Sequence, residues 1–162
     1  MSDMKDPWAK QQDGTECYLC SPRLSTKRDI RNIARLTISS LYLIQDQRFR
    51  GQCALIFHPR HATRFEELSD SEYIAFAQDL RVSVRGICAA LNPDHVNVAM
   101  LGNSCPHLHW GIVPRYRADP RWGRPWEGTT VQDARLNPKT LTEADYATVI
   151  SSIRTELERL EE

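Results

Sequence analysis

The chain has 162 residues, of which 41% are hydrophobic. This is the usual size of one domain with its own core, so we expect a single domain over residues 1–162. Its 21 acidic and 21 basic side chains cancel, and the excess of positive charge with which proteins hold nucleic acid or an anionic membrane is missing. A phosphate-bearing ligand would have to be held by local groups.

No targeting signal is expected in the N-terminal segment. Residues 1–6 are polar and lack the apolar core of a signal peptide, and no later stretch approaches the ~18 apolar residues of a membrane span. Residues 1–14 are expected to form a loose arm. The five cysteines are an odd number, and Cys53 and Cys88 lie in apolar runs, so no disulfide framework is expected. These features predict a soluble cytoplasmic protein.

A pair of cysteines follows the arm as Cys17-Tyr18-Leu19-Cys20. Two thiolates at this spacing are common in zinc sites, but the same pattern fits a redox pair or plain packing.

Two strands are predicted next. The run from Leu36 to Ile44 is rich in β-forming residues, and Cys53 to Phe57 is a second apolar run that follows the break at Gly51. Their spacing favours an antiparallel pair.

Two helices are predicted from their start signals. Ser69-Asp70-Ser71-Glu72 is a capping box, and an apolar stripe of helical period continues to Leu91 before the Asn92-Pro93 stop,. A similar start at Leu141-Thr142 opens a second apolar stripe that runs to Leu160,.

Two more strands are predicted between the helices, over 96–101 and 108–113, separated by a turn at 102–106. Neighbouring strands with only two principal helices indicate an α+β fold with a mainly antiparallel sheet. Residues 116–138 are expected to form an ordered loop, whose length suggests a function or an interface.

The last predicted strand carries two histidines on one face. Because side chains alternate along a strand, His107, His109 and Gly111 point to one side, and Leu108 and Trp110 to the other. Two imidazoles beside a Gly-Asn-Ser turn suit an anionic or metal ligand. The alternative is a pair of half-buried histidines with purely structural hydrogen bonds.

The string Pro106-His107-Leu108-His109 with Ile112-Val113-Pro114-Arg115 resembles the signature of the histidine-triad (HIT) superfamily, in which apolar residues separate three histidines. The likeness extends from Cys17 to about Trp126, and is strongest to diadenosine-polyphosphate hydrolases and phosphorylases, more distant to galactose-1-phosphate uridylyltransferase. It implies a HIT-like fold and a homodimer. Further landmarks in family order are Leu43 to Asp46 with Gly51, His58 to His61 with Glu67 to Ser69, Asn97 to Asn103, Arg115-Tyr116 and Asp119-Pro120.

The resemblance implies that His109 is a nucleophile. It would attack the α-phosphorus and form a covalent nucleotidyl-imidazole intermediate, which a second acceptor releases. Ser104, together with the turn amides around Gly102 and Asn103, would hold phosphate oxygens. Gln45 and Asn97 are weaker candidates for contact with the ribose or a phosphate. The residues assigned in this way to substrate binding are Gln45, Asn97, Gly102, Asn103, Ser104 and Gly111.

Gly111 departs from the family pattern, because it stands where the third histidine belongs. The uridylyltransferases have Gln there, so covalent transfer does not require the histidine. The sequence thus predicts a nucleotide hydrolase or nucleotidyltransferase that acts at the α-phosphate of a (di)nucleoside polyphosphate or a nucleoside phosphoramidate. The alternative is a catalytically weakened, zinc-stabilised nucleotide-binding module. Base preference, leaving group and acceptor stay open.

The resemblance also implies a structural zinc ion. Cys17, Cys20, His61 and His107 match the ligands of zinc-containing relatives, and two thiolates with two imidazoles form a closed shell without a catalytic position. His58 is the rival to His61. Such an ion would tie the N-terminal segment to the strand of the nucleophile.

A cluster of arginines and aromatic residues in the long loop raises the question of nucleic-acid binding. The net charge of zero argues against it, and a loop held by tryptophan packing is the plainer interpretation. Cys105 is either a reactive thiol or, as we prefer, a buried turn residue. The loop residues concerned are Arg115, Tyr116, Arg117, Arg121, Trp122, Arg124 and Trp126.

Overall fold

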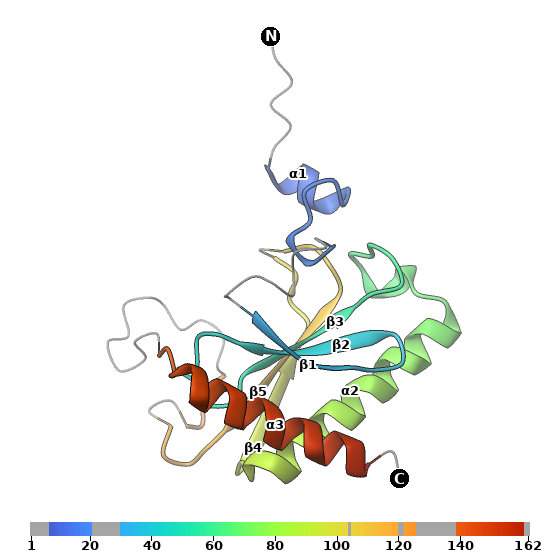
Figure 1. Ribbon diagram of the computed structural model, residues 1–162. Helices are drawn as coiled ribbons and strands as arrows, with labels where there is room; N and C mark the ends of the chain where they lie inside the picture. Colours follow the sequence, from blue (N-terminus) through green and yellow to red (C-terminus); the bar gives the residue numbers. More distant parts are fainter. Residues whose placement is uncertain (1–6, 21–29, 104, 120–121, 126–138, 161–162) are drawn as a thin grey trace.

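The structure is a computed structural model that describes residues 7–20, 30–103, 105–119, 122–125 and 139–160 (Figure 1). In this part of the chain, five strands form one antiparallel sheet in the order β1-β2-β3-β5-β4. The expected α+β fold with an antiparallel sheet is confirmed. The strands are β1 (Ile30–Arg35), β2 (Ser39–Ile44), β3 (Cys53–Phe57), β4 (His95–Ala99) and β5 (His109–Arg115).

Two long helices, α2 (Asp70–Leu91) and α3 (Glu143–Arg159), pack together against the sheet, as expected. Figure 1 shows both helices at the opposite end of the molecule from the N-terminal segment. No helix in the described ranges combines the length and the apolar character needed to cross a bilayer. The main core lies between sheet and helices and includes the buried residues Leu41, Leu43, Leu55, Ile112, Phe76, Ile87, Ile153 and Leu157.

The helix boundaries follow the local signals in the sequence. Ser69 accepts a hydrogen bond from the backbone N–H of Glu72, whose carboxylate accepts one from the Ser69 N–H. Both donors would otherwise be left without partners at the helix start. Asn92 adopts a left-handed conformation (φ 46°) and ends α2. The side chain of Thr142 caps α3 by accepting from the N–H of Asp145.

The first strand pair differs from the prediction at its turn. β1 was not predicted, and the expected strand from Leu36 begins only at Ser39. The buried carboxylate of Asp79 on α2 accepts hydrogen bonds from the N–H groups of Thr37, Ile38 and Ser39. A helix residue 40 positions away in the chain therefore shapes this turn.

The N-terminal segment covers part of the sheet face opposite the helices. Residues 7–12, expected to belong to a loose arm, form the short helix α1 (Pro7–Gln12). It leads to a single 3-10 turn, η1 (Tyr18–Cys20). The buried Cys17 and Leu19 then pack against Tyr42 and Ile56 of the sheet. Of the loop predicted over 116–138, residues 120–121 and 126–138 lie outside the described ranges.

Candidate functional site

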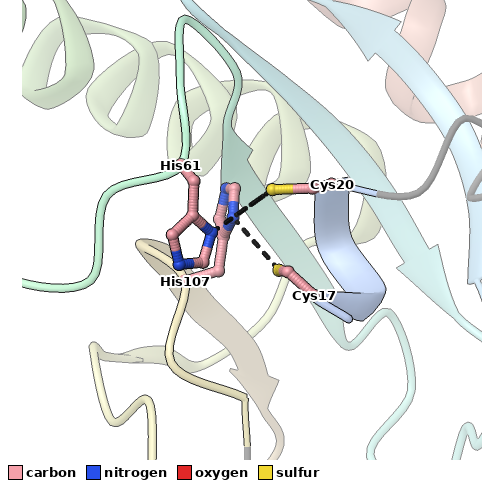
Figure 2. Close-up of side chains that lie close together, drawn as sticks. All are labelled: Cys17, Cys20, His61 and His107. Carbon is pink, nitrogen blue, oxygen red and sulfur yellow. Dashed lines mark hydrogen bonds between the residues drawn. The ribbon is translucent and has the colours of Figure 1, made fainter. Parts of the chain in front are cut away.

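Four side chains from three separate parts of the chain meet at one point. Cys17 precedes η1, Cys20 is its last residue, His61 follows β3, and His107 precedes β5. One ligand atom from each, two sulfurs and two nitrogens, lies within 4.8 Å of every other. Figure 2 shows the two imidazole rings facing the two sulfurs.

The distances within this cluster suit a tetrahedral metal ion. The Nδ1 atom of His107 lies 3.5 Å from the Sγ of Cys17 and 3.3 Å from that of Cys20, and Nδ1 of His61 lies 3.3 Å from Cys20 Sγ. Tetrahedral zinc with Zn–S ~2.3 Å and Zn–N ~2.0 Å separates sulfur from nitrogen by about 3.5 Å. The three sulfur-to-nitrogen distances therefore match those of a tetrahedral zinc site.

The two imidazoles are held with their Nδ1 atoms toward the sulfurs. Nε2 of His107 donates a hydrogen bond to the backbone oxygen of Phe57 (2.7 Å), and Nε2 of His61 donates to that of Gln12 (3.0 Å). A carbonyl only accepts, so each Nε2 carries the proton and each neutral ring presents a lone pair at Nδ1. Backbone carbonyls commonly orient metal-binding histidines in this manner.

Gly14 allows the N-terminal segment to approach His61. Its φ is +84°, a left-handed conformation that favours glycine,. A Cβ atom at this position would lie 3.1 Å from Cγ of the His61 ring. A side chain at residue 14 would therefore strain the backbone and crowd the ring that Gln12 orients.

The electrostatics of the cluster favour a bound cation. Burial, with the neighbouring Cys17, raises the pKa of the Cys20 thiol to about 12. Burial also raises the pKa of Cys105 to about 11 and lowers the pKa of His107 to about 4. The His107 imidazole is thus neutral, as a metal ligand must be, whereas the Cys20 thiol ionises only if a nearby positive charge stabilises its thiolate,.

His58, the rival to His61, lies outside the cluster. Its ring contacts Tyr42 edge to face, with ring centroids 6.3 Å apart. Cys105, in contrast, packs with the apolar group that contains Cys17. A third thiol therefore lies beside the four clustered residues, although the sequence assigned it no role in metal binding.

His109, the predicted nucleophile, is the first residue of β5 and is half-buried. Its Nδ1 donates a hydrogen bond of 2.7 Å to the backbone oxygen of His107. In the neutral ring the remaining lone pair is therefore on Nε2. This hydrogen bond thus fixes the tautomer of His109, and Nε2 takes no part in it.

The strand around His109 has one core face, as predicted. Leu108 is 2% exposed in the main core. Trp110 packs against Phe65 and, on α2, Phe76, with ring centroids 5.9 and 6.1 Å apart. The expectation that His107 also lies on the strand is wrong, because β5 begins at His109 and the chain bends at His107. That bend turns the His107 ring to the sulfurs.

Gly111 lies in a row of small residues. It is two residues beyond His109 on the same face of β5, and it pairs with Ala54 of β3 and Ala99 of β4. These three residues lie side by side across the sheet, whereas Ile56 lies opposite His109 itself.

Two of the predicted substrate-binding residues lie far from His109. Asn97 pairs with Val113, four positions along β5, which corresponds to roughly 13 Å,. Its Oδ1 accepts a hydrogen bond of 2.7 Å from the buried Arg115. Gln45 follows the end of β2, whereas Ser40, at the other end, is the β2 residue level with His109. Gln45 is thus about 17 Å away along the strand direction.

The turn before the cluster is described only in part. Gly102 has φ +69°, so this position requires glycine's freedom,. Asn103 follows it, and Ser104 lies outside the described residues. The turn runs directly into Cys105 and the cluster, so it is the nearest predicted phosphate-binding segment to His109.

Sequence comparison finds no relative: no protein-family model matches the chain, and no curated protein matches it. Solved structures do match. A histidine triad protein from Marinobacter aquaeolei VT8 is 24% identical with a TM-score of 0.73, over 89% of this chain and 98% of the other. One from Bradyrhizobium japonicum is 23% identical with the same TM-score, over 87% and 98%. This chain therefore has the histidine-triad fold.

Two more distant matches have informative names. A zinc-bound histidine triad family protein from Mycobacterium smegmatis is 16% identical, with a TM-score of 0.63 over 91% of this chain and 96% of the other. The diadenosine triphosphate hydrolase of Plasmodium falciparum is 13% identical, with a TM-score of 0.53 over 82% and 78%. Proteins of this fold thus include a zinc-bound member and a nucleotide hydrolase.

Proposed function

We propose that this protein is a nucleotide hydrolase or nucleotidyltransferase that works through a covalent intermediate on His109. Its substrate is a (di)nucleoside polyphosphate or a nucleoside phosphoramidate, attacked at the α-phosphate. The observation that carries this proposal is the hydrogen bond from His109 Nδ1 to the His107 backbone oxygen. It fixes the ring in the tautomer in which Nε2 is nucleophilic.

The surroundings of His109 support attack on a phosphate. Gly111, Ala54 and Ala99 form a row of small residues two positions beyond His109, between Tyr42 on β2 and the sheet edge, while Ile56 lies directly across from the ring. Main-chain amides of the turn at Gly102 and Asn103 are donors for phosphate oxygens, and we propose the same role for Ser104, which lies outside the described residues,. Because the net charge of the chain is zero, local donors are needed to hold a phosphate. Gln45 and Asn97 are the more distant candidates for contact with the substrate.

We further propose that Cys17, Cys20, His61 and His107 bind one structural zinc ion. The support is the tetrahedral fit of the four atoms and the orientation of both rings by backbone carbonyls. A closed shell of two thiolates and two imidazoles supplies rigidity and no Lewis-acid position. Cysteines that bind zinc instead of pairing as a disulfide suit the reducing cytoplasm.

Gly111 favours a second candidate function. A chain without a side chain at this position lacks the third histidine of the triad, and a slow or absent chemical step would leave a zinc-stabilised module that binds nucleotide. In that case nucleotide affinity would survive while no covalent adduct would form on His109.

The edge of the sheet at β4 suits a second copy of the chain, and we propose a homodimer there. Among the described strands, β4 pairs only with β5. Exposed Val98 on β4 lines the same pocket as exposed Trp122, and exposed Leu101 follows the end of β4. Unpaired strand edges and apolar side chains are the groups that strand pairing between subunits covers. Sedimentation should find a dimer that Val98→Lys weakens, and a monomeric wild type would refute this part.

The function is tested by capture of the intermediate. The full chain, loaded with zinc, is mixed with diadenosine triphosphate and quenched within one turnover, and peptide mass spectrometry locates any nucleotidyl group. An adduct on His109, absent from His109→Ala, supports the proposal. Tight nucleotide binding without adduct or turnover supports the binding module instead. Turnover by His109→Ala at the wild-type rate excludes His109 as nucleophile.

A further inference from the structure

The four clustered residues differ in their exposure to solvent. Cys20 is exposed, His61 is half-buried, and Cys17 and His107 are only 5% and 3% exposed. A small dissolved molecule can therefore reach the cluster from the side of Cys20. Reactive cysteines in redox-sensitive proteins are accessible in this way and have a second thiol beside them.

The local backbone places the sulfurs of Cys17 and Cys20 on the same side of a turn. The two residues are three positions apart across the 3-10 turn η1, and side chains at this spacing lie one above the other in such a turn. Their sulfurs lie within 4.8 Å of each other (Figure 2). A disulfide joins two sulfurs at about 2.05 Å and accepts Cα atoms roughly 4.4–6.8 Å apart. The pair can therefore close into a disulfide within this turn.

A third thiol lies against the buried member of the pair. The half-buried Cys105 packs with Cys17 and Leu19. Its side chain is hydrogen-bonded to Cys17, and its sulfur accepts a hydrogen bond from the backbone N–H of Leu19. Cys105 does not belong to the four residues whose ligand atoms lie within 4.8 Å of one another. Of these two sulfur neighbours of Cys17, only Cys20 is both exposed and a proposed zinc ligand.

Resting on the proposed zinc site, we infer that the cluster is a redox switch in which a peroxide converts Cys17 and Cys20 from metal ligands into a disulfide. As zinc ligands, both cysteines are thiolates. The Cys20 thiolate attacks one oxygen of hydrogen peroxide, the O–O bond breaks, and hydroxide leaves with its electron pair. The Cys17 thiolate then attacks the sulfur of the resulting sulfenic acid, and a second hydroxide departs. Two thiolates thus lose two electrons, and peroxide is reduced to two hydroxides.

The disulfide removes two of the four proposed ligands. A disulfide sulfur is neutral, so the imidazoles of His61 and His107 alone remain of the closed shell, and zinc is released. The ring of His107 then loses the contacts that its Nδ1 makes with the two sulfurs. Because the backbone oxygen of His107 accepts the hydrogen bond from His109 Nδ1, oxidation also reaches the predicted nucleophile.

Zinc release and disulfide mapping in the full chain test this inference. Zinc-loaded wild-type protein is treated with hydrogen peroxide beside a chromogenic zinc chelator, and alkylated cysteine peptides are identified by mass spectrometry. We expect release of about one zinc per chain, in step with formation of a Cys17–Cys20 disulfide. Cys53 is 1% exposed in the main core and should remain a thiol, so it is the internal control. Dithiothreitol with added zinc should restore the cluster.

Two substitutions separate the switch from general damage by peroxide. Cys20→His replaces the exposed thiolate by an imidazole, which binds zinc but forms no disulfide. It should release less than about a tenth of its zinc under conditions that empty the wild type. Cys105→Ser keeps both reacting sulfurs, so its rate of release should stay within about twofold of the wild-type rate. If Cys20→His does not bind zinc, the disulfide map of the wild type still decides.

The outcomes keep this inference apart from the two earlier proposals. Zinc that stays bound while peroxide oxidises other cysteines overturns the switch and leaves the zinc site standing. Release that requires Cys105, or a disulfide between Cys17 and Cys105, also overturns it as stated. Protein that binds no zinc overturns both the switch and the zinc site. Failure of the proposed function appears separately, as the absence of an adduct on His109, and does not change zinc release or the disulfide map.

Discussion

The nucleophile and the metal cluster are joined through one peptide group. His109 donates from Nδ1 to the backbone oxygen of His107 at 2.7 Å, while the His107 ring itself faces the sulfurs of Cys17 and Cys20. A shift of residue 107 therefore moves the acceptor that fixes the catalytic ring. Metal binding and nucleophile orientation should be coupled through this residue.

Replacement of His109 and replacement of His107 should have different effects on the protein. His109→Ala is expected to lower turnover by ~10⁴-fold or more and to preserve zinc content and nucleotide affinity, since only the nucleophile is lost. His107→Ala should release metal, lower stability and lose activity together. Metal analysis, nucleotide titration and kinetics on both variants give the comparison. Equal zinc loss in the two would contradict this separation of roles.

The metal site should contribute to stability. Protein purified without chelator should hold about one zinc per chain, and Cys17→Ser should reduce that content. A loss of about 2 kcal/mol would lower Tm by roughly 4–8 °C in a domain of this size. Cys88→Ser, on α2 and half-buried, is the matched control and should retain the metal. Zinc-free wild-type protein would refute the assignment.

The carboxylate of Asp79 should be a major stabilising group. It is 3% exposed and accepts hydrogen bonds from three backbone N–H groups of the β1–β2 turn and from the Ser39 hydroxyl (2.6 Å). In Asp79→Asn, the NH₂ group of the amide would face these N–H and O–H donors and could not accept from them. The substitution should therefore lower the free energy of unfolding, measured in urea, by about 2–4 kcal/mol. Asp70→Asn, exposed on the same helix, should cost far less.

Asp46 should contribute to stability in a defined range of pH. Partial burial raises the pKa of its carboxyl, but hydrogen bonds from the Arg48 side chain and from the N–H groups of Lys139 and Arg48 outweigh burial and hold the pKa below its usual value. The unfolded chain therefore binds a proton first as pH falls. This stabilisation is present above about pH 4 and is lost on further acidification.

The test of this pH dependence is a comparison of unfolding midpoints. Between pH 7 and pH 3, Asp46→Asn should lose less stability than the wild type, because its amide does not titrate. The exposed Asp70→Asn variant serves as the control. An equal loss in wild type and Asp46→Asn would show that the Asp46 contacts do not favour the ionised form.

Local signals in the sequence were sufficient for much of the fold. The capping box of Ser69 and Glu72 predicted the start of α2, and alternation along the strand predicted that Leu108 and Trp110 face the core. β1 was not predicted because Arg31 and Arg35 interrupt its apolar residues. The late start of β2 depends on Asp79, whose contact with the turn crosses 40 positions of the chain.

The candidate site was harder to predict where its geometry depends on backbone atoms or on residues distant in the sequence. The spacing of residues does not distinguish His58 from His61, whereas the path of the chain after β3 brings only His61 to the sulfurs. The backbone carbonyls of Phe57 and Gln12 orient the rings of His107 and His61. This role could not be predicted from the sequence, because every residue has a backbone carbonyl. Asn97 resembles a ligand contact in sequence, yet its oxygen is used by the buried Arg115.

The hydrogen bond between His61 Nε2 and the backbone oxygen of Gln12 determines how far the chain can be shortened from its N-terminus before the cluster loses a group that holds it. A chain shortened to begin at Thr15 keeps both cysteines and both histidines, but the His61 ring loses the carbonyl that selects its tautomer. Such a truncated protein should bind zinc more weakly although every ligand is present. The working boundary of the domain therefore lies ahead of Gln12, within the segment that the sequence led us to expect as a loose arm.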